Sequence, residues 1–400
     1  MIRTPRVQAA MREVPRHVFL PRVPLRRAYA NDVAATKRDA DGIPISAASQ
    51  PSIVGAMLEQ LATAPGDRVL EIGAGTGYNA ALLAYLAGGD GTVVTMDVDD
   101  DIVDGARAAL SAAGFPDVTV VRGDGALGHP PGAPYDRIIA TVGARDVPLA
   151  WQEQLAPGGR IVVPLRLRGS VMRSIAFERA PGPDSRVLRS VSSEMCGFMP
   201  MRASIASDPR RTVPLTPSGD VLLDVQTEQE HAVDTDALRG VFGYAGVTTA
   251  TGARFDTLTA AEWLYLWLTC VLDNGLFGMT VKQAAIDKGL VAPMFRWGAM
   301  AAADGDSLAY LTLLPADGVS PENAAPAENH APREVGVVGH GPRGGDLAET
   351  VAEEVGVWDR TYRTRVARFE ISPAVSGPEE GQFAFRTPAN TLIISWERAR

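Results

Sequence analysis

Cysteine is scarce in this chain. The 400 residues include only two, Cys196 and Cys270, both in apolar surroundings. Two cysteines cannot supply a disulfide framework, so the sequence predicts buried thiols in a reducing compartment. No apolar run is long enough to cross a bilayer, and the arginine-containing start does not resemble a signal peptide. We therefore expect a cytoplasmic protein with no membrane partner.

Histidine is also scarce, and the chain carries a net negative charge. None of the five histidines has metal-ligand spacing with a cysteine or another histidine, and no Ser-His-acid arrangement stands out, so we expect no metal. The net charge of -9 argues against general nucleic-acid binding. Residues 1–40 nevertheless hold nine Arg or Lys against three Asp or Glu, a local +6. A solvated surface is the ordinary interpretation, and a basic arm that attracts an acidic peptide or protein is the alternative.

Short apolar segments alternate with helical patterns in the first half of the chain, whose total length allows two or three domains. This alternation predicts an α/β fold, a Rossmann-like and mostly parallel doubly wound sheet, with ligands at the carboxyl ends of the strands. The expected strands are 68–72, 91–96, 118–122, 135–141 and 159–164, and the expected helices are 7–14, 51–61, 80–86, 102–113 and 151–155.

The alternation stops after about residue 167, and the remainder indicates an additional α+β region. A helix over 257–272, a hairpin around Asp304-Gly305, a helix over 346–362 and a strand over 390–396 are expected. We predict three parts: an N-terminal helical and extended arm (1–45), an α/β domain (46–205) and a C-terminal α+β domain (206–400).

A glycine-rich turn follows the first strand of the α/β region. The run Val69–Asn79 contains glycines spaced G-x-G-x-G behind an acidic residue, whereas a dinucleotide fingerprint reads G-x-G-x-x-G. The spacing suits a phosphate-free ligand, S-adenosylmethionine (SAM), better than a pyrophosphate. The predicted cofactor ligands in this run are Glu71, Gly73, Gly75, Thr76 and Gly77.

Acidic residues end the next two strands. Asp97 lies nearest the second apolar run and can accept hydrogen bonds from ribose hydroxyls, while Asp99 to Asp101 are expected to be solvated or to cap a helix. Asp124-Gly125 ends the third strand, where a carboxylate suits the adenine amino group. A simple turn is the alternative interpretation of that pair.

These residues belong to segments that resemble the protein-L-isoaspartate O-methyltransferase family. The resemblance extends over about residues 5–167 and implies a SAM-dependent O-methyltransferase that acts on a carboxylate of a protein or peptide. The matching segments are Val7–Pro21, Ala28-Tyr-Ala30, Ile45–Leu58, Pro65–Ala84, Gly123-Asp-Gly125, Tyr135–Ala140 and Gln154–Pro164. Because a carboxylate with a pKa of about 3.9 is already an anion at neutral pH, such an enzyme needs no general base.

The resemblance also implies an acceptor site in the Ile45–Leu58 segment. Ser49 matches the family's active-site serine, for which a helix cap is the structural alternative. The expected substrate-binding residues around it are Ile45, Ser46, Gln50 and Ser52. The chain departs from the repair enzymes in the alanine-rich Ser46-Ala-Ala48 and at Ser52, where those enzymes usually have an aromatic residue or histidine.

The long C-terminal region is similar to actinobacterial methyltransferases that accompany ribosomally made lanthipeptides, lasso peptides and graspetides. Gly197–Arg202 and Val357–Arg360 resemble parts of their tail. This resemblance implies that the α/β domain (46–205) is a SAM-dependent methyltransferase domain and that the C-terminal domain (206–400) recognises the substrate. It also implies methylation of an aspartate in a cyclised peptide, followed by aspartimide and isoaspartate formation. Repair of isoaspartyl damage in proteins is the alternative. Methylation of RNA or a small molecule, and a binding module without activity, fit the sequence less well.

Overall fold

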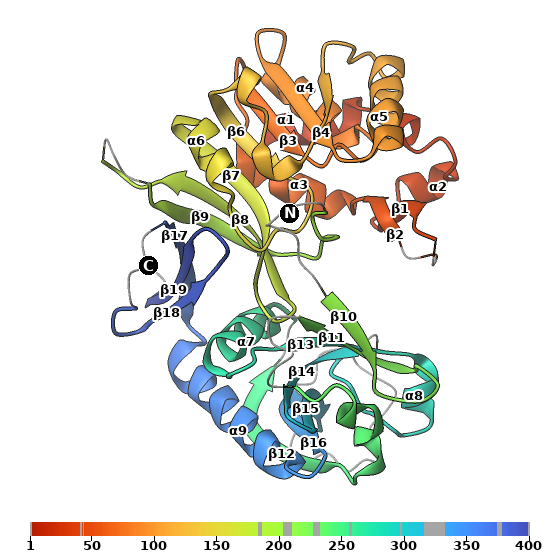
Figure 1. The fold of residues 1–400 in the computed structure, drawn as a ribbon, viewed down its shortest axis with the longest axis vertical. Helices are drawn as coiled ribbons and strands as arrows, with labels where there is room; N and C mark the ends of the chain where they lie inside the picture. Colours follow the sequence, from red (N-terminus) through yellow and green to blue (C-terminus); the bar gives the residue numbers. More distant parts are fainter. Residues whose placement is uncertain are drawn as a thin grey trace. The chain divides into compact units, whose positions relative to one another are not determined.

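The computed structural model describes residues 2–40, 42, 44–182, 186–202, 210–226, 233–255, 258–296, 298–315, 333–373 and 378–398, and it has two compact units (Figure 1). The first unit comprises Met1–Arg166, Met172–Asp208 and Arg368–Ile394. The second comprises Leu167–Val171, Pro209–Ala367 and Ser395–Arg400.

The first unit is built on a sheet of ten strands among the described residues, in the order β18-β19-β17-β9-β8-β7-β6-β3-β4-β5. In chain order the strands are β3 (Arg68–Ile72), β4 (Thr92–Asp97), β5 (Thr119–Arg122), β6 (Tyr135–Ala140), β7 (Leu155–Arg168), β8 (Val171–Arg179), β9 (Leu188–Met195), β17 (Arg365–Ser372), β18 (Gln382–Arg386) and β19 (Thr391–Arg398). A separate hairpin pairs β1 (Ala34–Arg38) with β2 (Pro44–Ala48).

Helices accompany this sheet. They are α1 (Pro5–Glu13), α2 (Leu25–Ala28), α3 (Pro51–Leu61), α4 (Tyr78–Ala87), α5 (Asp100–Ala112) and α6 (Leu149–Gln154). Short 3-10 turns are η1 (Arg16–Phe19), η2 (Gly125–Leu127) and η3 (Pro130–Gly132). The core joins apolar side chains of α1, α3 and α4 to those of the sheet, among them Val7, Leu58, Val69 and Leu82.

The strands β3, β4, β5 and β6 are parallel neighbours, and β7 continues the parallel set beside β6. Four of the five residues of β3 are buried, as expected for a strand covered on both faces. Proline at the first position favours α3. The predicted Rossmann-like α/β arrangement of the catalytic domain is therefore confirmed, with each predicted strand and helix present.

The second unit contains a seven-stranded antiparallel sheet in its described part, in the order β10-β11-β13-β14-β15-β16-β12. Its strands are β10 (Arg210–Pro214), β11 (Val221–Gln226), β12 (Val247–Phe255), β13 (Phe277–Val281), β14 (Gly298–Asp304), β15 (Ser307–Leu314) and β16 (Arg333–His340). The helical segments are η5 (Ala237–Gly243), α7 (Leu258–Val271), α8 (Gln283–Asp287), α9 (Gly344–Val357) and the π-helical η7 (Trp358–Tyr362). The predicted hairpin is β14–β15, in which Asp304 pairs with Ser307.

The predicted partition of the chain differs from the two units in two ways. Residues 1–45 are not a separate arm, because α1 packs on α3 and α4 within the first unit. The C-terminal part is not one domain, because β17 returns to the first unit and pairs with β9 through Ile371 and Leu188. The predicted boundary at 205/206 lies outside the described residues.

Candidate cofactor and acceptor site

The glycine turn links β3 to α4 at the carboxyl edge of the parallel strands. Gly73, Gly75 and Gly77 have φ values of +100°, +50° and +84°, which favour glycine. A side chain at Gly73 would meet Thr141, and one at Gly77 would meet Leu110, whereas nothing lies within 4 Å of the position of a Cβ at Gly75. The turn is thus packed against protein at its two ends and open at its middle glycine.

Asp97 ends β4 beside this open glycine. Its Oδ2 accepts a hydrogen bond from the Gly75 amide at 3.1 Å, and its Oδ1 accepts one from the Val98 amide at 2.9 Å. Each carboxylate oxygen keeps a further lone pair, and the side chain is only partly buried. Asp97 therefore combines a fixed orientation with free acceptor capacity, which suits a pair of ligand hydroxyls.

Glu71 lies beneath the turn and is fully buried. Its Oε1 accepts from Asn79 Nδ2 at 2.8 Å, and its Oε2 accepts from Thr95 Oγ1 at 2.6 Å. Burial raises the pKa of Glu71 to about 7. With both oxygens engaged inside the protein, Glu71 supports the turn from behind, and its predicted direct contact with the cofactor stays a prediction.

Asp124 and Gly125 follow β5 at the same edge. Asp124 Oδ1 accepts from the Ala126 amide at 3.0 Å and caps η2, which fits the turn interpretation, while the adenine contact stays a prediction. A Cβ at Gly125 would lie 2.5 Å from Ile72 and 3.7 Å from the Met201 sulfur. The segment after β9 thus approaches this edge, and it is held there because Met201 and Met199 exchange backbone hydrogen bonds with Gly143.

Ser49 occupies the loop between β2 and α3. The N-cap of α3 is Gln50, so the alternative interpretation of Ser49 as the helix cap is wrong. The Ser49 hydroxyl makes no hydrogen bond to any described residue. Its carbonyl accepts from Arg16 Nη2 at 2.8 Å, and Arg16 Nε donates to the Ala28 carbonyl at 2.8 Å.

Arg16 joins this loop to the glycine turn. The guanidinium carbon lies 5.0 Å from the ring centroid of Tyr78, the first residue of α4. Arg16 is buried, which lowers its pKa, and its Nη1 has no hydrogen-bond partner among the described residues. The first turn of α3 is held separately, since the Ser52 amide donates to Asn31 Oδ1 at 3.0 Å.

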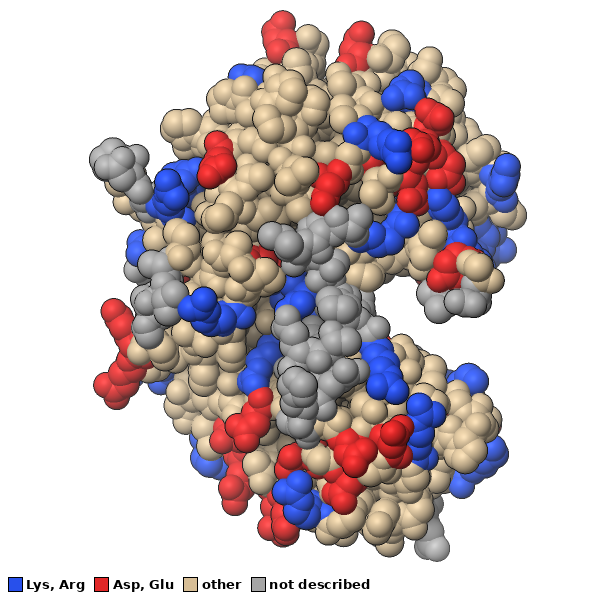
Figure 2. Space-filling model, viewed as in Figure 1, with Lys and Arg blue, Asp and Glu red and all other residues tan. Residues whose placement is uncertain are grey.

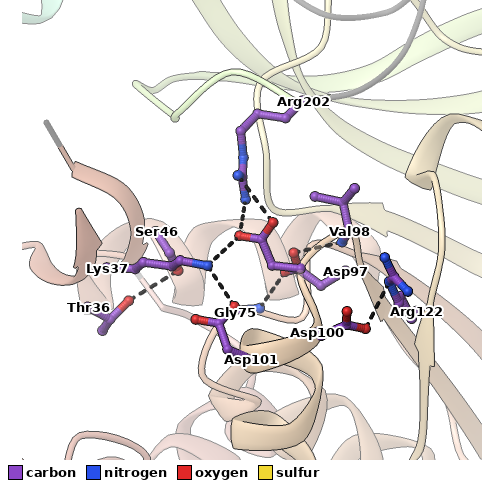
Figure 3. A network of polar contacts seen from close by, with 11 residues as sticks. Thr36, Lys37, Ser46, Gly75, Asp97, Val98, Asp100, Asp101, Arg122 and Arg202 are labelled. Atoms are coloured by element: carbon purple, nitrogen blue, oxygen red, sulfur yellow. Dashed lines mark hydrogen bonds and ion pairs between the residues drawn. The ribbon is translucent and has the colours of Figure 1, made fainter. Parts of the chain in front are cut away.

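The β1–β2 hairpin, which carries Ile45 and Ser46, is tied to the turn that follows Asp97 (Figure 3). Lys37 Nζ donates to Asp99 Oδ2 at 2.8 Å and to Asp101 Oδ1 at 2.6 Å. Arg202 Nη2 donates to the same Asp99 Oδ2 at 2.8 Å. We call Lys37, Asp99 and Arg202 the clamp.

The structure differs from the prediction for Asp99, and it shows two further residues beside the predicted site, Lys37 and Arg202. Asp99 stands at the N-cap position of α5 but makes no capping bond with its side chain. It joins the hairpin to the segment after β9 instead. The hydrogen bond from Arg202 is the largest cause that lowers the pKa of Asp99, and the hydrogen bond from Lys37 lowers it further. Sequence reasoning assigned no role to Lys37 or Arg202, because ion pairs between distant segments leave no local pattern.

These residues fit SAM. The open position at Gly75 admits a ligand close to the backbone, Asp97 offers free acceptors beside it, and Asp124 follows the adjacent strand β5. A parallel sheet with this turn and these acidic strand ends defines a SAM-dependent methyltransferase of Rossmann-like fold. No group of three or more His, Cys, Asp or Glu in the described part of the chain is arranged to hold a metal, and no described helix has the length and hydropathy to span a membrane.

Comparisons with known proteins identify the family. The family model "Protein-L-isoaspartate(D-aspartate) O-methyltransferase (PCMT)" matches residues 1–197. The chain is 41% identical to "Protein-L-isoaspartate O-methyltransferase 1" of Rhodopseudomonas palustris over 223 residues, which are 54% of this chain and 85% of that protein. The chain therefore belongs to the protein-L-isoaspartate O-methyltransferase family and is a SAM-dependent O-methyltransferase.

Solved structures are similar at lower identity. One named "Protein-L-isoaspartate O-methyltransferase" has 21% identity and a TM-score of 0.47, and the match covers 91% of this chain and 92% of the other. A putative protein-L-isoaspartate O-methyltransferase from Plasmodium falciparum, in complex with S-adenosyl-L-homocysteine, has 14% identity and a TM-score of 0.43, with 51% and 93% covered.

Proposed function

We propose that this protein methylates the free carboxylate of an isoaspartyl residue in a protein or peptide. The match to a protein-L-isoaspartate O-methyltransferase over 85% of that relative's length carries the proposal. The arrangement of the site supports it, because Arg16 holds the Ser49 loop against the start of α4, where the glycine turn ends. Arg16 thus joins the acceptor loop to the end of the glycine turn within the first unit.

Methyl transfer to a carboxylate does not require the protein to remove a proton from the acceptor. The free group of an isoaspartyl residue is an α-carboxylate, whose ordinary pKa of about 3.5 makes it an anion at neutral pH, so no general base is required. When bound, SAM supplies a methyl group whose bond to sulfur breaks as a bond to the carboxylate oxygen forms, which leaves S-adenosylhomocysteine. We assign the Gly73–Gly77 turn, Asp97 and Asp124 to holding the cofactor.

Ser49 orients the acceptor in this proposal. Its hydroxyl is free to donate to a carboxylate oxygen or to the substrate backbone, while Arg16 fixes the loop that presents it. Ile45, Ser46, Gln50 and Ser52 border the same loop and would contact the residues around the acceptor. Positioning and exclusion of water are then the main contributions to the rate.

A second candidate substrate is an aspartate in a cyclised, ribosomally made peptide. The observation that favours it is the second unit, since the family model ends at residue 197 and leaves most of this unit, Pro209–Ala367 and Ser395–Arg400, unmatched. A region of this size can recognise one particular peptide. The cofactor and the acceptor chemistry would be unchanged, and the product ester would cyclise to an aspartimide.

Three peptides separate the two candidates: an isoaspartyl peptide, its aspartyl isomer and a cyclised aspartyl peptide, each incubated with enzyme and SAM. The proposal predicts methyl ester on the isoaspartyl peptide alone. Ester on the cyclised peptide, with none on the isoaspartyl one, would contradict it and support the second candidate.

A further inference from the structure

Exposed apolar side chains gather in the segment that follows Arg16. Leu25, Tyr29 and Val33 are 63%, 50% and 49% exposed. The Tyr29 amide donates to the Leu25 carbonyl at 3.3 Å, so these two side chains lie on one face of a helical turn. Large apolar side chains grouped at the surface mark contact sites more often than isolated ones do.

The same segment carries unneutralised positive charge. Arg22, Arg26 and Arg27 are exposed. Arg27 faces Asp32 at 3.9 Å with both side chains in solvent, a separation at which an ion pair contributes little. Arg22 and Arg26 have no ion pair within the described ranges. Lys and Arg side chains accordingly gather over α2 and β1 on the face shown in Figure 2.

This surface is fixed to the acceptor loop through three contacts. Arg16 bonds the carbonyls of both Ala28 and Ser49. The Ser52 amide bonds Asn31, which lies between Tyr29 and Val33. The Tyr29 hydroxyl lies 2.9 Å from His17 Nδ1, next to Arg16 in the chain. A ligand that rests on the surface therefore contacts a segment that Arg16 links to Ser49 and Asn31 links to Ser52.

We infer that this surface docks an acidic, apolar-containing stretch of the peptide substrate beside the residue to be methylated. The inference rests on the proposed function and adds a preference within it. Unpaired arginines attract carboxylates of the substrate and favour encounter, and the apolar side chains cover a neighbouring apolar residue. We call Arg22, Leu25, Arg26, Arg27, Tyr29 and Val33 the docking surface.

The test uses three fluorescent isoaspartyl peptides that differ only in the residues beside the isoaspartyl residue. Each peptide has a leucine there, together with two glutamates, two glutamines or two lysines. Anisotropy with S-adenosylhomocysteine present measures binding, and methylation assays give KM and kcat. The glutamate peptide should bind about fivefold more tightly than the glutamine peptide at low salt, and more weakly as salt rises, with similar kcat.

Variants locate the effect. The double variant Arg22→Gln, Arg26→Gln should abolish the preference for the glutamate peptide. Leu25→Ser should weaken the binding of all three peptides. Arg107→Gln removes one positive charge from α5, where Arg107 pairs with Asp104, and should leave the preference intact. Equal binding of the three peptides, or a preference that survives in the double variant, would overturn the inference while methylation itself upholds the proposed function. Tight selective binding without any methylation would instead overturn the proposed function.

Discussion

Lys37 Nζ lies 2.8 Å from Asp99 Oδ2, and this contact joins the β1–β2 hairpin to the turn that follows Asp97. Lys37 pairs in the hairpin with Ser46, while Asp99 stands two residues after Asp97. Both carboxylates that face Lys37 raise its pKa, Asp101 more than Asp99. The hairpin and the turn that follows Asp97 are therefore electrostatically linked, although 62 residues separate the two partners.

Breaking this contact should weaken the binding of both ligands, SAM and the isoaspartyl peptide. We expect Lys37→Met and Asp99→Asn each to raise the Kd for SAM and the KM for an isoaspartyl peptide by about 3- to 10-fold. The two changes together should cost less than the sum, since they remove one interaction. Titration calorimetry and steady-state kinetics measure these effects. Arg122→Met, which breaks the exposed pair with Asp100, is the control, and a loss as large there would remove any special role for the clamp.

Ser49→Ala tests the acceptor side alone. Loss of a hydrogen bond to a charged group should lower kcat/KM by about 10- to 100-fold, while the Kd for SAM is unchanged. Ser111→Ala, at an exposed position of α5, is the matched control. Loss of SAM binding in Ser49→Ala would place the serine in the cofactor subsite instead.

Gly75→Val tests the open position in the glycine turn. A branched side chain there fills the space left beside Asp97, so binding of SAM should be lost. Gly66→Val is a matched control, because Gly66 also has a positive φ, +85°, and open space, but lies before β3. Comparable stability of the two variants, with SAM bound only by Gly66→Val, is the expected result. Unchanged SAM affinity in Gly75→Val would contradict the placement of the cofactor.

Glu71 should give the cofactor-free protein a pH-dependent stability. Its pKa is raised from 4.5 to about 7, so the folded chain retains a proton that the unfolded chain releases. The contribution of Glu71 to the free energy of unfolding should fall as pH rises from about 4.5 to about 7 and stay constant above, a change on the order of 3 kcal/mol. Glu71→Gln removes this dependence. Urea unfolding at several pH values measures it, and parallel curves for the two proteins would refute it.

The glycine turn and the strands around it could be predicted from the sequence because their determinants are local, while the cofactor contacts assigned to these residues stay predictions. The strand Arg68–Ile72, the three glycines and the acid at the end of β4 are contiguous or follow a fixed alternation. Buried parallel strands and a turn that needs positive φ impose those residue types directly. Asp97 was identified among four nearby acids for the same reason, since it ends the apolar run.

Other features depend on contacts that no local pattern encodes. The pairing of Ile371 with Leu188 brings the C-terminal strands back to the first unit across more than 180 residues, so the chain could not be divided correctly by position alone. Lys37, Arg202 and Arg16 act through partners far along the chain. Arg16 stood within a matching segment, but its link to Ser49 appears only in three dimensions.

We propose that methyl transfer to an isoaspartyl carboxylate takes place at the site formed by Ser49 and the glycine turn. The most direct measurement is mass spectrometry of two peptides of identical sequence, one with an isoaspartyl and one with an aspartyl linkage, after incubation with SAM and wild-type or Ser49→Ala enzyme. We expect methyl ester on the isoaspartyl peptide, strongly reduced by Ser49→Ala. Wild-type enzyme that binds SAM but leaves the isoaspartyl peptide unmodified would contradict it.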